Sequence, residues 1–92
     1  MARRLPDEMI AIRCEGYGPP EVLRPVRVPV PRPGPGEILV EVASAGVNRP
    51  DVLQRRGGYP PPPGVTDIPG LEVAGEVVAT GPGAERFAVG DR

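Results

Sequence analysis

Short apolar blocks separated by glycine and proline recur along this chain, as short β-strands recur between tight turns. Strands are predicted over four segments, residues 9–14, 22–30, 37–47 and 71–80. Residues 1–8 (MARRLPDE) are charged and contain no such block, so we expect a flexible N-terminal tail there. Residues 9–92 are expected to form one mostly β domain, a small barrel or a sandwich.

Two of the predicted strands contain residues that restrict how they pair. Pro25 and Pro29 interrupt residues 22–30, and because proline has no N–H for a ladder, this segment is predicted as an edge strand or an extended connector. Gly75 lies inside residues 71–80, where a glycine indicates a β-bulge or a close backbone approach.

The clearest alternation of apolar and other residues lies in residues 37–47 (EILVEVASAGV). Ile38, Val40 and Val42 share one face of this strand, and Glu41 lies on the opposite face. The difference between the two faces predicts that one side of the strand is buried.

One short helix is predicted over residues 49–56, where the pattern suits about two turns. Asn48 stands at its start and can cap it, while Pro50 and Asp51 are residues that a first helical turn tolerates and favours. The glycine pair 57–58 is expected to end the helix.

Composition restricts the classes of function. The chain has 92 residues, 39% of them hydrophobic, so its core is thin and leaves no room for a large enclosed substrate cavity. Its 11 basic and 12 acidic residues leave a net charge of −1, which gives no electrostatic footprint for nucleic acid or an anionic membrane.

The single cysteine and the absence of histidine restrict the chemistry further. Cys14 has no partner for an internal disulfide, and a cysteine–histidine zinc site within this chain is excluded. We interpret Cys14 as a small core residue. No segment has the pattern of a signal peptide or a membrane span, so we expect a soluble, cytoplasmic protein.

Three polar residues are candidates for chemistry, and each has a structural interpretation beside the functional one. Asn48 is either a helix cap alone or also a hydrogen-bond partner of a bound carbonyl, since one amide can serve both purposes. Tyr59 either packs on the proline run 60–63 or directs its hydroxyl at a substrate. Glu72, on the same strand face as Glu76, is a solvated charge or a carboxylate that orients a neighbouring group.

The proline run itself has a further interpretation, as a ligand for an aromatic groove on another protein. No disordered segment flanks it, so this interpretation is the weaker one.

The motifs together resemble a known family. MIAIRCEGYGPPEVL, GVNRPD, GGYPPPPG, PGLEVAG and VGDR follow one another from Met9 to Arg92. Their combination and order resemble the N-terminal GroES-like domain of the medium-chain dehydrogenase/reductases, in the branch of NADPH:quinone oxidoreductases related to zeta-crystallin. The resemblance implies a partly closed, mostly β barrel with one short helix.

The resemblance also implies roles for individual residues. Zinc-dependent alcohol dehydrogenases of this superfamily carry a cysteine ligand where Asn48 stands and a histidine ligand where Leu71 stands, so no catalytic zinc is expected here. Hydride from NADPH would then reduce a quinone or enone, with hydrogen bonds stabilising the negative oxygen. That role falls to Asn48 and Tyr59, while Asp51 holds the helix start and Glu72 has a structural or hydrogen-bonding role.

The resemblance finally implies a larger protein. The family's nucleotide-binding Rossmann domain follows this domain and is absent here, so no cofactor-binding residue can be named. We expect a fragment that is inactive alone and a homodimer when full length, with a small-molecule quinone or enone as its substrate. Two alternatives stay open: an enoyl-thioester or alkenal double-bond reductase of the same superfamily, and a non-catalytic GroES-like binding module.

Overall fold

The computed structural model describes residues 5–92, which fall into two compact units built from interleaved segments. The first unit contains residues 5–7, 29–45 and 73–92, and the second contains residues 8–28 and 46–72. Most of the tail predicted over residues 1–8 lies outside the described residues. Strand β1 already begins at Glu8, one residue earlier than predicted.

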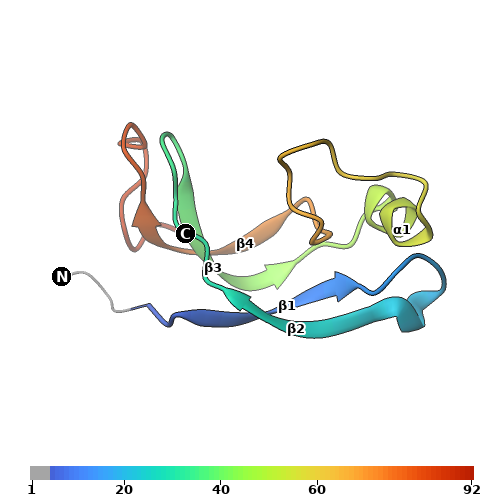
Figure 1. Cartoon of the computed structure of the whole chain (residues 1–92). Coiled ribbons are helices and arrows are strands. Elements are labelled where there is room, and N and C mark those ends of the chain that lie inside the picture. The colour runs from blue at the N-terminus through green and yellow to red at the C-terminus, as the bar shows by residue number, and fades with distance from the viewer. Residues whose placement is uncertain (1–4) are drawn as a thin grey trace. The chain divides into compact units, whose positions relative to one another are not determined.

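The second unit contains strand β1 (Glu8–Cys14), helix η1 (Pro20–Val22), strand β2 (Leu23–Pro29) and helix α1 (Arg49–Arg56). Strands β1 and β2 form a two-stranded sheet, in which they run side by side (Figure 1). Because a two-stranded sheet consists only of edges, the prolines of β2 can stand where their missing N–H breaks no ladder. The prediction of an edge strand over this segment is therefore confirmed.

The first unit is built on strands β3 (Ile38–Ala45) and β4 (Val73–Thr80), which pair antiparallel from Ile38 opposite Thr80 to Ala45 opposite Val73 (Figure 1). The register shifts between Val42 and Ser44, next to the partner residue Gly75. A Cβ at Gly75 would overlap the backbone carbonyl of Glu41. The close backbone approach, one of the two alternatives predicted for this glycine, is confirmed, while the extra residue of the neighbouring bulge is Ala43 of β3.

Burial along β3 differs from the prediction of one buried face. Ile38, Leu39 and Val40 are all half-buried, although they alternate between faces, and Val42 is 52% exposed. Coverage therefore follows position along the strand and not its faces: the first three residues are half-buried and the last five are exposed. The prediction of one buried side is therefore wrong.

The core is small, as the composition predicted. The buried apolar side chains of residues 5–92 are Val28, Val77, Val78 and Ala84. The predicted class, mostly β with one short helix, is confirmed. Within the described part of the chain, no helix has the length and apolar character needed to cross a membrane.

Candidate active site

Helix α1 begins and ends where the sequence predicted. Asn48 is its N-cap in an extended conformation, and the reciprocal contacts of Asn48 and Asp51 form a capping box. The carboxylate of Asp51 accepts the backbone N–H of Asn48 at 2.9 Å. Gly57 ends the helix at φ +89°, a left-handed conformation that glycine adopts without a Cβ penalty.

The Asn48 side chain is held on two sides. Its Nδ2 donates a hydrogen bond to Glu72 Oε1 at 3.1 Å, and its other end faces the backbone N–H of Asp51 in the capping box, an N–H that is itself donated to the Asn48 backbone carbonyl at 3.0 Å. The side chain therefore links the start of α1 to the segment that enters β4, 24 residues later in the chain. The prediction that Asn48 is a helix cap is confirmed, and the cap does not use the whole amide.

Glu72 lies one residue before β4, with its carboxylate over Gly46. A Cβ at Gly46 would overlap the Glu72 side chain, and the Gly46 N–H donates to the backbone oxygen of Glu72 at 3.2 Å. The glycine thus leaves the space in which the carboxylate reaches Asn48. Glu72 is exposed, as a solvated charge would be, yet it also makes the orienting contact that was its alternative interpretation.

Tyr59 is not brought into this cluster by any hydrogen bond. Its side chain is 52% exposed, and its hydroxyl has no hydrogen-bond partner among residues 5–92. The structure therefore joins two of the three predicted site residues, Asn48 and Asp51, and leaves Tyr59 apart from their network. A role for Tyr59 toward a substrate stays a prediction.

Arg55 is a residue that sequence reasoning missed. It is 9% exposed, and its Nη1 donates to the carbonyl oxygen of Gly18 at 3.0 Å, while the Gly18 N–H donates to the Arg55 carbonyl at 2.9 Å. Next to this pair, the Tyr17 ring packs against Gly57, where a Cβ would approach within 2.9 Å. This clasp, residues 17–18 with 55 and 57, fixes the C-terminal end of α1.

Comparisons with known proteins assign the chain to a family. The model of the alcohol dehydrogenase GroES-like domain matches residues 34–92, nearly two thirds of the chain. The chain belongs to this family. Its resemblance to the quinone oxidoreductases of the medium-chain dehydrogenase/reductases is confirmed, since several relatives carry that name.

Individual relatives agree over almost the whole chain. An alcohol dehydrogenase of Schizosaccharomyces pombe is 38% identical over 96% of the chain, and a quinone oxidoreductase of Lama guanicoe is 41% identical over 91%. The native structure of a mycobacterial quinone oxidoreductase superposes with a TM-score of 0.78 at 43% identity, over 91% of this chain and 26% of that one. The chain spans about a quarter of the length of these curated relatives, 25% and 26%.

The GroES-like domain carries no zinc-type ligand set at the two positions singled out by sequence. Asn48 directs an N–H2 group at Glu72, and Leu71, 65% exposed, has no lone pair to offer a metal. Within residues 5–92, no three His, Cys, Asp or Glu side chains come together as a metal site would require. The donor groups at these positions do not fit zinc.

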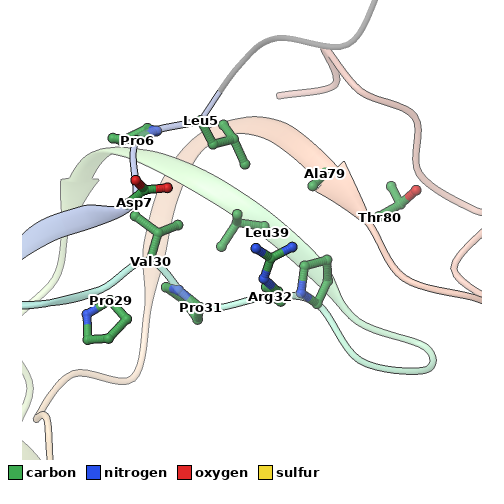
Figure 2. A pocket seen from close by; sticks show the side chains of 11 residues that line it. Leu5, Pro6, Asp7, Pro29, Val30, Pro31, Arg32, Leu39, Ala79 and Thr80 are labelled. Atoms are coloured by element: carbon green, nitrogen blue, oxygen red, sulfur yellow. The ribbon is translucent and has the colours of Figure 1, made fainter.

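Two cavities of the GroES-like domain lie apart from these residues. One of about 250 Å³ is lined by Cys14, Gly16, Tyr17, Gln54, Pro61 and Asp67, so Cys14 borders a cavity and is only half-buried. The other, about 750 Å³ in the first unit, has a wall of prolines with Val30, Leu39 and the guanidinium of Arg32 (Figure 2). Neither lining includes Asn48, Asp51 or Tyr59.

Proposed function

We propose that this GroES-like domain forms the substrate side of a zinc-independent, NADPH-dependent oxidoreductase that reduces a quinone or an enone. The proposal is supported by relatives named quinone oxidoreductase at 41% and 43% identity. A relative of similar identity, 38%, is named alcohol dehydrogenase, so names alone do not decide between the two activities. The decision rests on the chemistry of the side chains.

The Asn48 amide is the observation that carries the proposal. It is neutral, half-buried and held by Glu72 and Asp51, at a position where the zinc enzymes of the superfamily have a thiolate ligand. A fixed N–H donor stabilises an oxygen that becomes negative during reduction, and it does so without rearranging at the moment of reaction. The positive end of the α1 dipole lies beside it and acts in the same direction.

The described residues offer no cradle for the cofactor. The sequence contains no G-x-G-x-x-G motif, and α1 follows β3 through Gly46, Val47 and Asn48 without a glycine-rich phosphate loop. NADPH, when bound, supplies the hydride from outside this domain. The domain's own contribution is to accept the substrate oxygen at Asn48, with Asp51 fixing the start of the helix and Tyr59 as a second donor.

We expect the protein isolated from its source to oxidise NADPH with a small quinone such as duroquinone, at a rate that a metal chelator leaves unchanged. The native mass, measured beside the 9.7 kDa of this chain, shows whether further domains or a second subunit are present. Turnover that disappears with chelator contradicts the zinc-independent mechanism. A native mass near 9.7 kDa without turnover favours the non-catalytic binding module.

Replacing Asn48 by alanine is expected to lower kcat about tenfold, the cost of one neutral hydrogen bond made in the transition state, about 1.4 kcal/mol. Alanine also removes the N-cap, so Asn48→Ser is the matched control, because serine caps helices as well as asparagine does. Steady-state kinetics should show a similar loss in both variants, with stability reduced in the alanine variant alone. Unchanged kcat in a folded serine variant would contradict the role of the amide.

A separate measurement determines whether the acceptor is a quinone or the conjugated double bond of an enoyl thioester or an alkenal. Comparing kcat/KM for duroquinone, a 2-alkenal and an enoyl thioester in the same preparation distinguishes these reductases. We expect the quinone to have the highest value.

A further inference from the structure

The two neighbours of the Asn48 amide have opposite hydrogen-bonding character. An ionised carboxylate such as Glu72 only accepts hydrogen bonds, while the backbone N–H groups at the start of α1 only donate them. Glu72 Oε1 therefore selects the Nδ2 end of the amide at 3.1 Å, and the capping box selects the oxygen end. Both contacts favour the same orientation of the amide, because a flip would break the hydrogen bond to Glu72 and turn the N–H2 group toward the N–H of Asp51.

This orientation determines what the amide can offer to a ligand. Nδ2 carries two hydrogens, and one of them is donated to Glu72. The other has no acceptor among the described residues, and Asn48 is half-exposed. An incoming group therefore meets an N–H at Asn48, while the carbonyl end faces the helix start.

We propose that Glu72 is the positioning residue that makes Asn48 a hydrogen-bond donor, so that the site selects ligands with an accepting oxygen. This inference rests on the proposed function and names its ligand class, a carbonyl such as that of a quinone or an enone. Gly46 contributes to the same arrangement, because a side chain there would occupy the place of the Glu72 carboxylate.

The chain allows a direct test by nuclear magnetic resonance. It contains a single asparagine, Asn48, and a single glutamine, Gln54, so its ¹⁵N-labelled spectrum shows only two side-chain amide pairs. Gln54 donates through Nε2 to the backbone oxygen of Asp67 at 2.8 Å and is an internal reference for the fold. In the full chain, the Glu72→Ala substitution should move the Asn48 signals toward the chemical shifts of a solvated amide and speed the hydrogen exchange of this amide. The Gln54 signals should stay in place.

Two further variants separate orientation from a general loss of structure. Gly46→Ala keeps the carboxylate but displaces it, and we expect it to move the Asn48 pair as Glu72→Ala does. Glu21→Ala makes the same change at an exposed carboxylate in the same unit and should leave both pairs unchanged. An Asn48 pair that stays in place in Glu72→Ala overturns the inference, whatever the substrate is.

Titration with duroquinone distinguishes this inference from the proposed function. The four alkene carbons of its ring all carry methyl groups, which block the addition of the Cys14 thiol to the ring. We expect duroquinone to shift the Asn48 pair of the unmodified chain and to shift it at least threefold less in Glu72→Ala. If the variant moves the Asn48 pair but duroquinone leaves it in place in the unmodified chain, the amide is oriented by Glu72 and its assignment to a quinone carbonyl is wrong.

Discussion

Arg55→Ala is expected to lower the free energy of unfolding by about 2 kcal/mol, the contribution of a hydrogen bond to a charged group together with the cost of an unpaired carbonyl. Arg55 Nη1 donates to the Gly18 carbonyl at 3.0 Å in a part-buried setting, and no other side chain among residues 5–92 donates to that oxygen. Its removal leaves the backbone bond from Gly18 N–H to the Arg55 carbonyl, 2.9 Å, as the remaining hydrogen bond between Gly18 and this end of α1.

Urea denaturation at 25 °C, followed by circular dichroism, measures this loss. Arg56→Ala is the matched control: the same change at the next residue of the last helical turn, where the side chain is exposed. A surface substitution of this kind is expected to stay within about 0.5 kcal/mol. Equal stability losses in the two variants would show that helix charge, and not the clasp to Gly18, accounts for the effect.

The clasp and the capping box act on opposite ends of one eight-residue helix. A helix of this length is marginal in isolation, so its position depends on the contacts at its ends. Arg55 fixes one end to Gly18, and Asn48, through Glu72, fixes the other end to the segment before β4. Loosening the clasp is therefore expected to broaden the Asn48 amide signals as well as to lower stability.

Helix α1 could be predicted residue by residue because its signals are local. Asn48, Asp51 and Gly57 act within a few positions of the turns that they start or end, so their roles follow from residue type and spacing. The close backbone approach at Gly75 was predictable for a related reason, since a glycine in a strand interior commonly marks a bulge or a close approach.

The contacts that orient the site could not be predicted in this way. Glu72 reaches Asn48 across 24 residues, and Arg55 reaches Gly18 across 37, and neither separation leaves a periodic signal in the sequence. Arg55 in particular belongs to a residue type that is almost never fully buried unless paired. The prediction of burial along β3 was wrong because it used strand alternation alone, whereas the observed burial changes along the length of the strand.

The proposed function assigns a hydrogen-bonding role to the two positions at which the resemblance implies metal ligands in the zinc enzymes. Asn48 and Leu71 occupy the two positions, and the acid beside them, Glu72, bonds to the amide instead. A carboxylate that orients a neutral amide also places negative charge near the substrate oxygen. Under the proposed function, this would oppose the build-up of charge on that oxygen and favour acceptors such as quinones, in which the ring delocalises the negative charge.

Gly75→Ala is expected to have the largest effect on stability, a loss of about 3 kcal/mol, which is the upper part of the range for overpacked sites. The added Cβ would overlap the Glu41 carbonyl oxygen and approach its carbon to 2.9 Å. Both are backbone atoms of the paired strand, so no side-chain rotation relieves the clash, and β3 and β4 must separate locally. A chain of this size has roughly 5–14 kcal/mol of stability in total, so the loss should be visible as a clear shift of the urea midpoint.

Gly58→Ala is the matched control for this substitution. A Cβ there would lie 3.7 Å from the nearest atom, the Leu53 oxygen, and Gly58 does not adopt a positive φ, so we expect a change within about 0.5 kcal/mol. Alanine also restricts the unfolded chain more than glycine does, which offsets part of any loss in both variants equally. If Gly75→Ala unfolds at the same urea concentration as Gly58→Ala, the strands are not held together at the bulge, and the register shift between Val42 and Ser44 does not require a glycine.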